Sequence, residues 1–468
     1  MSAKQSNRKQ RTTAARRSQP RRSQPRRAAT QPRNPEIRFD DLGPLWQRWL
    51  GANQDKPVPL DRWLKQAHNR QQGLSPAQRW ALNSAMIQAS RFQQLAQALE
   101  DQFFQDDEID WQQWDLQWQT GQLRGDAFWY WIGLRGHGQW LKSRHQLRDT
   151  SYRERLFTAL KQQALEQPLS PLWCLWHGIR PQWLALLQQR AQQSGWSDKQ
   201  LQSFIKKQCD FPPLWLRAKA GTNLAELEQS LNEQGVDAQL KHINGSEVLA
   251  AFGGKAVQSS SQYQQGEIEI QDLASQQIAA AVGARPGDKI WDACAGAGGK
   301  SLALASALNG KGSVTATDIQ QYKLDELKRR AKRAQLQNIR QFCWDGEQPL
   351  KLPAEIRKQH GFDRILVDAP CTAAGTWRRN PDARWRFSAS DSQQLQILQQ
   401  QLLQHASAAL RPGGVLVYAT CSWQLSENEQ QVDTFLQHNP DFTLDEQCML
   451  GAPLEDADCM FYARLLKR

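Results

Sequence analysis

The sequence lacks any run of ~18 or more apolar residues, so we expect no membrane-spanning helix. It also lacks the apolar leader segment of a secretory signal peptide, and we therefore expect a cytoplasmic protein. Cysteine is scarce: the eight cysteines in 468 residues include no Cys-x-x-Cys pair, which excludes a dense disulfide framework. We expect free thiols, no bound metal, no membrane partner and a monomer. Hydrophobic residues make up 40% of the chain, enough to form the cores of several domains.

Acidic residues are absent from residues 1–35, which contain eleven lysines and arginines and two copies of Arg-Arg-Ser-Gln-Pro. This segment has too little apolar surface to fold, so we expect a disordered arm. Such an arm would bind RNA phosphates in a salt-dependent manner, and a tail that only improves solubility is the alternative. Because the net charge of the whole chain is +12, the residues after the arm are close to neutral.

Residues 36–207 have few strand signals, and their apolar residues recur at helical spacing, which predicts a helical domain. Ser75 and Pro76 are suited to cap and begin a helix. Fifteen of the 20 tryptophans precede Gly221. Their helical spacing fits either base stacking or a buried packing seam, and we expect the seam. The tryptophans that show this spacing are Trp46, Trp49, Trp111, Trp114 and Trp118.

Residues 208–262 predict a small α+β module. Leu214–Arg217 is typical of a short strand, and a helix over Asn223–Gln234 is expected with Thr222 as its cap. From residue 263 to 468, strands alternate with helices, which predicts an α/β fold with a doubly wound, Rossmann-like parallel sheet. The expected strands are Lys289–Asp292, Ser313–Thr317, Gln341–Trp344, Asp363–Asp368 and Gly414–Ala419, and the expected helices are Ser275–Val282, Lys300–Leu308, Gln320–Gln335 and Ser392–Ala409.

A glycine-rich loop follows the first of these strands and opens a helix. Its glycines allow a tight turn and a close approach of the backbone to a ligand. The loop consists of Asp292, Ala293, Cys294, Ala295, Gly296, Ala297, Gly298, Gly299 and Lys300. Asp318 ends the second strand, where an acid can bind ribose hydroxyls, and Asp345 follows the third. This pattern predicts a nucleotide-type cofactor; the missing Gly-x-Gly-x-x-Gly disfavours a dinucleotide, and a purely structural turn is the other alternative.

Two cysteines follow strands at the edge where parallel sheets bind ligands. Cys371 comes shortly after Asp368, and Cys421 comes directly after the fifth strand. A buried apolar role is the commonest fate of a free cysteine, and we expect it for the others. These are Cys174, Cys209, Cys294, Cys343, Cys448 and Cys459. Cys371 and Cys421 are instead expected to face the crevice of the glycine loop.

These motifs together resemble the RsmB/Nop/Sun family of RNA cytosine-5 methyltransferases over Gln208–Arg468. The resemblance rests on several motifs in a fixed order: Pro213–Arg217, Gln271-Asp272 with Ser275-Gln276, Asp292–Lys300, Asp368–Cys371, Arg378–Trp385, Tyr418–Ser422 with Glu427-Asn428, and Met460–Arg464. It implies S-adenosyl-L-methionine as cofactor, an RRM-like middle module and a NusB-like helical domain. Ribosomal RNA is the first expected substrate and transfer RNA the second.

The resemblance also implies roles for six residues. Cys421 would add to carbon 6 of cytosine as a thiolate, which activates carbon 5 for methyl transfer. Cys371 would assist release of the methylated product. Asp368 would hold the base, Lys300 would stabilise a thiolate or a nucleoside hydroxyl, and Asp318, Asp345 and Asp368 would serve as cofactor- and base-binding acids.

The glycine loop departs from the family pattern Cys-Ala-Ala-Pro-Gly-Gly-Lys, because it reads Cys-Ala-Gly-Ala-Gly-Gly-Lys from Cys294 to Lys300. Loss of the proline is expected to loosen the loop while activity survives. A DNA cytosine-5 methyltransferase is one alternative, and Cys421 argues against it. The other is a catalytically weak RNA-binding assembly factor, which the altered loop, the basic arm and the long helical domain would suit.

Overall fold

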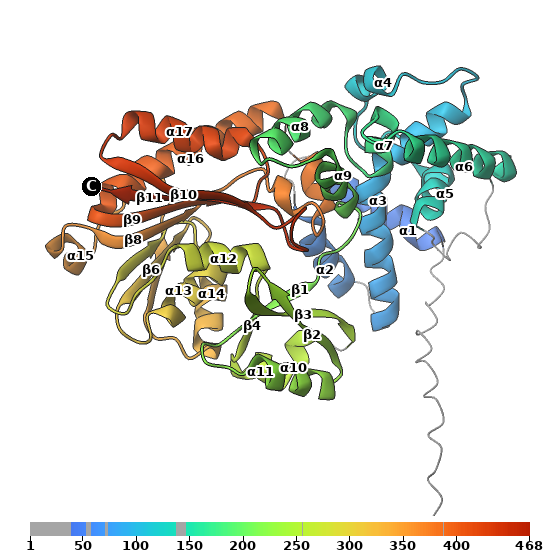
Figure 1. Cartoon of the computed structure of the whole chain (residues 1–468). Coiled ribbons are helices and arrows are strands. Elements are labelled where there is room, and N and C mark those ends of the chain that lie inside the picture. Colours follow the sequence, from blue (N-terminus) through green and yellow to red (C-terminus); the bar gives the residue numbers. More distant parts are fainter. Residues whose placement is uncertain (1–38, 53–57, 71–73, 137–146, 255, 387) are drawn as a thin grey trace, which may run out of the picture.

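The computed structural model describes residues 39–52, 58–70, 74–136, 147–254, 256–386 and 388–468 (Figure 1). The basic arm predicted over residues 1–35 lies outside these ranges. No helix within these ranges is both long enough and apolar enough to cross a membrane.

The first part of the chain is helical, as predicted. Its long helix α3 begins with a capping box, in which Ser75 Oγ accepts a hydrogen bond from the Gln78 amide at 3.2 Å and the Gln78 side chain accepts one from the Ser75 amide. The helices are α1 (Phe39–Ala52), α2 (Leu60–Arg70), α3 (Pro76–Phe103), α4 (Trp111–Gln117), α5 (Gly125–Gly136), α6 (Thr150–Glu166), α7 (Pro171–Trp176), η2 (Pro181–Trp183), α8 (Leu184–Gln193) and α9 (Asp198–Lys207).

The tryptophans of this helical region form a packing seam, as predicted. Trp46, Trp49 and Trp111 are buried in one core, and Trp46 stacks on Phe128 with ring centroids 5.4 Å apart. Trp118 is also buried, and its ring lies 5.1 Å from that of Trp385 in the C-terminal part of the chain. These rings are occupied by protein contacts and are not available to stack on bases.

A four-stranded antiparallel sheet follows, in the order β2-β3-β1-β4. Its elements are β1 (Leu214–Ala218), α10 (Leu224–Glu233), β2 (Val236–Ile243), β3 (Ser246–Gly254), η3 (Val257–Ser259), α11 (Ser261–Gln265) and β4 (Ile268–Ile270). The sheet continues beyond residue 262, since β4 pairs with β1. Asn223 rather than Thr222 caps α10, because its extended backbone lets its side chain accept from the amides of Ala225 and Glu226.

The C-terminal part holds a seven-stranded sheet in the order β10-β11-β9-β8-β5-β6-β7. The strands β9, β8, β5, β6 and β7 are parallel, whereas β11 is antiparallel to its neighbours. The strands are β5 (Lys289–Asp292), β6 (Ser313–Asp318), β7 (Ile339–Cys343), β8 (Phe362–Asp368), β9 (Leu410–Thr420), β10 (Phe442–Leu450) and β11 (Met460–Lys467). This is the Rossmann-like fold that the alternation of strands and helices predicts.

Helices cover both faces of this sheet (Figure 1): α16 and α17 lie on one face, and α12, α13 and α14 lie on the other. The bounds are α12 (Leu273–Ala281), α13 (Gly299–Ala307), α14 (Gln321–Arg333), α15 (Ala354–Lys358), η4 (Ala374–Thr376), η5 (Pro381–Trp385), α16 (Ala389–Ala409), η6 (Leu425–Glu427) and α17 (Glu429–His438). Four of the five predicted strands and all four predicted helices agree with these bounds within three residues. The fifth, β9, begins four residues before the predicted Gly414.

The helical region packs on the carboxyl edge of the large sheet. Trp377 follows β8 and Trp423 follows β9, and both share one hydrophobic core with Trp173 and Phe204 of the helical region. The loops that leave the parallel strands are therefore held between two parts of the chain.

A buried ion pair strengthens this joint. The Arg190 guanidinium donates two hydrogen bonds to Glu429, at 2.7 and 2.6 Å, and a third to the Trp423 carbonyl. The Arg190 side chain is fully buried. Arg190 Nη1 also donates to Ser194 Oγ at 3.3 Å within the helical region, whereas Glu429 and Trp423 lie in the C-terminal part of the chain. The pair with Glu429 therefore joins α8 to α17.

We predict that Arg190→Ala lowers the free energy of unfolding by about 3–5 kcal/mol, because Glu429 is left without its buried partner. Urea unfolding followed by tryptophan fluorescence measures the loss. Arg329→Ala is the control: it removes an exposed pair with Glu326, which is worth less than about 1 kcal/mol. Equal unfolding curves for the two variants would contradict the assignment.

Candidate active site

Four loops meet at the carboxyl edge of the large sheet. Because the strand order there is β9-β8-β5-β6, Cys421, Asp368, the glycine loop and Asp318 follow adjacent strands. Adjacent parallel strands place such residues on one edge. The structure therefore brings together the residues that the sequence predicts for one crevice, with Asp345 at its exposed end after β7.

The glycine loop adopts a backbone that favours glycine at two positions. Gly296 has φ 55° and Gly298 has φ 85°. A Cβ on Gly298 would also lie 2.5 Å from Cγ of Leu327, whereas a Cβ on Gly296 would meet no atom within 4 Å. Gly296 is thus required for its conformation alone, and Gly298 also for a close approach to α14.

The same loop is tied to the end of β6. The Gly296 amide donates to Asp318 Oδ2 at 3.0 Å, and the Ala295 amide donates to the Thr317 carbonyl at 2.8 Å. Asp318 Oδ1 accepts from the Gln320 amide at 2.8 Å. Beside it, the apolar side chain of Ile319 is 65% exposed, which leaves an apolar surface next to a carboxylate. A nucleoside presents the matching combination of an apolar ring and ribose hydroxyls.

Asp292 is a buried acid, and one of its two carboxylate oxygens has no hydrogen-bond partner among the described residues. Its Oδ2 accepts from the Ser301 hydroxyl at 2.5 Å, so the oxygen that lacks a partner within the described ranges is Oδ1. Burial raises the pKa of the carboxyl to about 7, against the lowering effect of the Ser301 hydrogen bond. A buried polar atom without a partner is costly, so Oδ1 is suited to a donor group on a bound ligand.

Lys300 and Asp368 form an ion pair between the glycine loop and β8. Lys300 Nζ lies 2.7 Å from Asp368 Oδ2, and the lysine side chain is buried. Burial lowers the pKa of Lys300, but the hydrogen bond and the negative charge of Asp368, together with the charge of Asp292, outweigh it and raise the pKa above its ordinary value. The ammonium therefore keeps its charge beside the thiol of Cys421.

The two predicted cysteines are in direct contact. The sulfur atoms of Cys371 and Cys421 lie 3.4 Å apart, and both residues are only partly buried. The hydrogen bond with Cys421 and burial raise the pKa of Cys371 well above its ordinary value. Cys371 is therefore held as a thiol that can donate to its neighbour.

A buried hydrogen-bond network, which was not predicted from the sequence, joins the loop that contains Cys371 to the loop that contains Cys421. Glu427 is fully buried and accepts from both the amide and the hydroxyl of Thr372, at 2.9 and 2.6 Å. The Thr420 hydroxyl donates to Asn428 Oδ1 at 2.5 Å. The Glu427-Asn428 motif could be recognised in the sequence, but the motif does not show which residues its side chains bind.

The remaining cysteines divide into three groups by burial. Cys174 and Cys459 are buried, as predicted for structural thiols. Cys343 is exposed, so its predicted burial is wrong: it ends β7, the outermost strand of the sheet, where no further strand covers it. The other three are partly buried.

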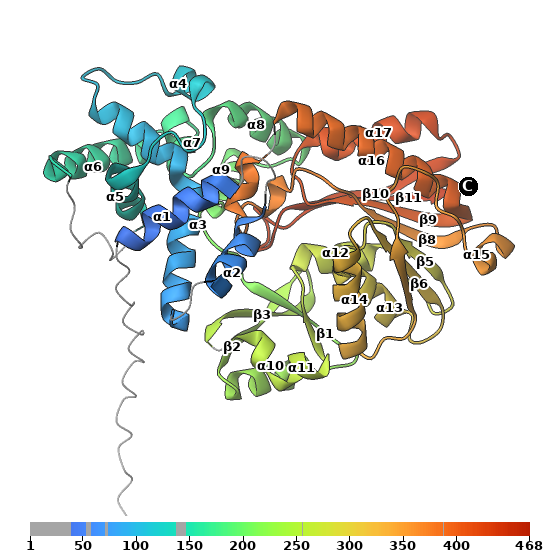
Figure 2. The same ribbon diagram turned by 180° about the vertical axis from the view of Figure 1, so that it is seen from behind.

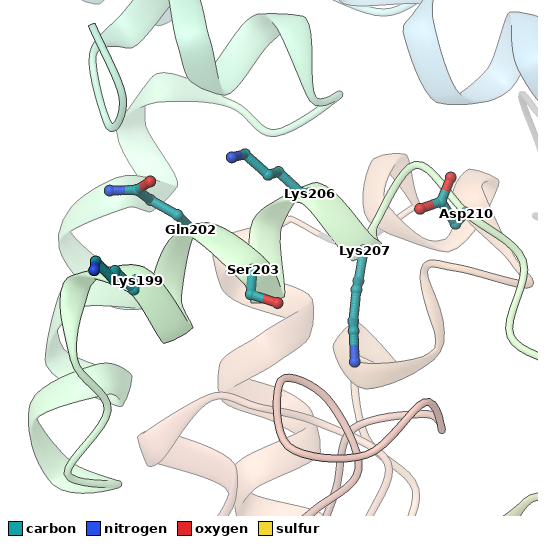
Figure 3. Close-up of a pocket in the computed structure, with 6 residues that line it drawn as sticks. All are labelled: Lys199, Gln202, Ser203, Lys206, Lys207 and Asp210. Atoms are coloured by element: carbon teal, nitrogen blue, oxygen red, sulfur yellow. The ribbon is translucent and has the colours of Figure 1, made fainter. Parts of the chain in front are cut away.

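One hollow of about 370 Å³ lies on α9, away from the predicted site residues. Three of its six lining residues are lysines: Lys199, Lys206 and Lys207. Figure 3 shows that Lys206 and Lys207 point in opposite directions, and Lys207 Nζ donates to the carbonyls of Pro453 and Glu455. The lysines do not converge on one centre, and we assign no ligand to this hollow.

The sequence of the catalytic part matches a known family. The family model described as 16S rRNA methyltransferase RsmB/F covers residues 279–464. Two curated relatives, each named ribosomal RNA small subunit methyltransferase B, come from Enterobacter sp. and from Yersinia pestis. Each is 32% identical over 300 residues, which cover 62% of this chain and 67% of the relative. The chain belongs to the RsmB/F methyltransferase family. The predicted family is thus confirmed.

Solved structures confirm the fold. PH0851 aligns with a TM-score of 0.61 and 21% identity over 86% of this chain and 93% of its own. NSun6 from Pyrococcus horikoshii, solved with SFG, aligns with a TM-score of 0.50 and 17% identity over 60% of this chain and 97% of its own. The family and the fold place the chain among S-adenosylmethionine-dependent methyltransferases, as the sequence predicts.

We predict that iodoacetamide labels Cys371 far more slowly than Cys343 near neutral pH. The thiolate is the reactive form, and the raised pKa of Cys371 keeps it a thiol. Labelling of Cys371 should increase as the pH rises toward that pKa, because the thiolate fraction then grows. Mass spectrometry of tryptic peptides measures both rates, with exposed Cys343 as the internal reference; equal rates at neutral pH would contradict the prediction.

Proposed function

We propose that this chain methylates carbon 5 of a cytosine in ribosomal RNA through a covalent adduct with Cys421. The observation that carries the proposal is the 3.4 Å contact between the sulfur atoms of Cys371 and Cys421, next to a buried lysine and the glycine loop. Ribosomal RNA as substrate is supported by the relatives, whose names describe methyltransferases of the small-subunit ribosomal RNA.

The chemistry needs a thiolate because carbon 5 of cytosine is a weak nucleophile. The sulfur of Cys421 bonds to carbon 6, and the electron pair of the 5,6 double bond becomes available at carbon 5. Carbon 5 then takes the methyl group that S-adenosylmethionine supplies. Finally water takes the proton from carbon 5, and the electron pair of that C–H bond forms the 5,6 double bond again. The bond between sulfur and carbon 6 breaks with its electron pair going to sulfur, which regenerates Cys421.

The neighbours of Cys421 are suited to these steps. The Lys300 ammonium stabilises negative charge on the attacking sulfur. Asp368 Oδ2 is paired with Lys300, and the carboxylate can accept a hydrogen bond from the cytosine amino group. Cys371, kept as a thiol, can donate a hydrogen bond or a proton to the Cys421 sulfur as it leaves the ring.

The residues of the glycine loop fit the cofactor. Asp292 Oδ1 would accept a hydrogen bond from the amino group in the methionine part of S-adenosylmethionine, and Asp318 would accept hydrogen bonds from the ribose hydroxyls. The exposed side chain of Ile319 would pack on the adenine ring, with exposed Asp345 beyond it. Backbone atoms of the loop from Ala293 to Gly299 would surround the methionine part.

We predict that Cys421→Ala abolishes methyl transfer, whereas Cys371→Ala allows transfer but accumulates a covalent protein–RNA adduct. Without Cys371, the leaving sulfur lacks its hydrogen-bond donor and elimination becomes slow. Transfer of a tritiated methyl group to small-subunit RNA measures the first effect, and denaturing gel electrophoresis with radiolabelled RNA measures the second. Full activity of Cys421→Ala would refute the assigned roles.

We also predict that cells lacking the gene lose 5-methylcytosine at one or more positions of small-subunit ribosomal RNA. Bisulfite sequencing of total RNA from cells with and without the gene measures this loss. Restoration by the native gene but not by the Cys421→Ala gene is the control. A loss confined to transfer RNA would overturn the proposed substrate.

A further inference from the structure

Helix α2 connects the helical region to the segments that follow β8 and β6. Its residues Leu60 and Leu64 are buried in the helical core. The Leu60 amide donates to Asp382 Oδ2 at 3.1 Å, and Asp382 lies in η5 after β8. On the other side, Arg62 Nη1 donates to the Tyr322 hydroxyl at 3.0 Å, and Tyr322 lies in the first turn of α14 after β6.

The position of α2 relates it to the glycine loop. Strand β5, which leads into that loop, lies between β8 and β6 in the sheet. A helix that contacts segments following β8 and β6 therefore spans the part of the edge that contains the loop. Figure 2 shows α2 beside α3, on the side of the helical region toward α12 and α14.

Hydrogen bonds connect Arg62 to the glycine loop through Tyr322, Gln320 and Asp318, with the side chain and the backbone of Gln320 each making one of them. The Tyr322 hydroxyl accepts from Arg62 and donates to Gln320 Oε1 at 2.6 Å, which uses both functions of one hydroxyl. The backbone N–H of Gln320 donates to Asp318 Oδ1 at 2.8 Å, and the backbone N–H of Gly296 donates to Asp318 Oδ2 at 3.0 Å. The chain thus leads from the helical region to the proposed ribose-binding acid.

The start of α14 depends on these contacts. Its N-cap residue, Gln320, makes no capping hydrogen bond with its side chain, which instead accepts from Tyr322. The Arg62 guanidinium also lies over the Tyr322 ring, 4.6 Å from its centre. Apart from this chain, the charged partner of Asp318 is Lys323, at 3.8 Å. Arg62 therefore supplies an external brace to a helix start that lacks a side-chain cap.

We propose that Arg62 is a positioning residue for the cofactor site, through which the helical region holds Asp318 and the start of α14 in their binding arrangement. The inference rests on the proposed function, in which Asp318 binds the cofactor ribose. Arg62 touches neither substrate nor cofactor and acts through Tyr322 and Gln320. By thermodynamic reciprocity, cofactor binding also stabilises the docked position of the helical region, which the resemblance associates with RNA binding.

The test is the affinity of the full chain for S-adenosylhomocysteine, measured by calorimetry without RNA. Arg62→Ala should weaken binding about three- to tenfold, the effect of one exposed charged hydrogen bond. Arg62→Lys should recover part of the loss, because it keeps the charge. Lys65→Ala is the matched control: Lys65 is an exposed cation one turn further along α2, and it should leave the affinity unchanged.

A double-mutant cycle distinguishes positioning from a general effect on folding. Tyr322→Phe keeps the ring and removes the hydroxyl, so it should weaken binding by itself. Adding it to Arg62→Ala should cause little further loss, because the two residues act through one chain of hydrogen bonds. Fully additive losses would overturn the proposal. So would an unchanged affinity in Arg62→Ala, which would leave Arg62 as at most a contact to RNA phosphates.

Asp318→Asn separates failure of this inference from failure of the proposed function. If Asp318→Asn leaves the affinity unchanged, the proposed cofactor site is wrong, and the inference fails with it. If Asp318→Asn weakens binding while Arg62→Ala behaves like Lys65→Ala, the cofactor site stands and only the role of Arg62 is refuted. Thermal unfolding of each variant checks that the fold is retained.

Discussion

The ion pair between Lys300 and Asp368 joins the glycine loop to the end of the strand that leads to Cys371. Lys300 lies in the first turn of α13, and Asp368 ends the strand that leads to Cys371. Both charges lie in a largely buried place, where removing one partner of such a pair commonly costs about 3–5 kcal/mol. Because the pair connects the end of β8 with the loop that follows β5, the glycine loop cannot shift without disturbing the segment that leads to Cys371.

Contacts with the helical region hold the other side of these loops. Arg91, in the middle of α3, donates to the carbonyls of Cys209 and Arg378, and Trp385 donates to the Ser90 carbonyl. The Arg378–Trp385 segment is thereby clamped between the helical region and the catalytic sheet. The helical region therefore contacts the loops at the carboxyl edge of the sheet directly, which gives a physical reason for it to affect the residues there.

Local patterns were enough to predict most elements near the site. Strand β5 matches its predicted bounds, because a short apolar run before a glycine loop has a clear beginning and end. Two local predictions were wrong. Asn223 caps α10 in place of Thr222, since neighbouring residues compete for one cap and backbone conformation decides between them. Cys343 is exposed, since burial depends on which strand lies at the edge of the sheet.

Local sequence patterns specify the kinds of groups at these strand ends: two thiols, a lysine, several carboxylates and a glycine turn. Periodicity and turn residues act over short distances along the chain, and therefore they leave a pattern that can be read without coordinates. The three-dimensional fold alone shows that the sulfur atoms of Cys371 and Cys421 are in contact, that Glu427 binds Thr372 in the loop after β8, and that Arg62 donates to Tyr322. Such partners are 50 to 260 residues apart, and a hydrogen bond between distant residues leaves no local signal in either segment.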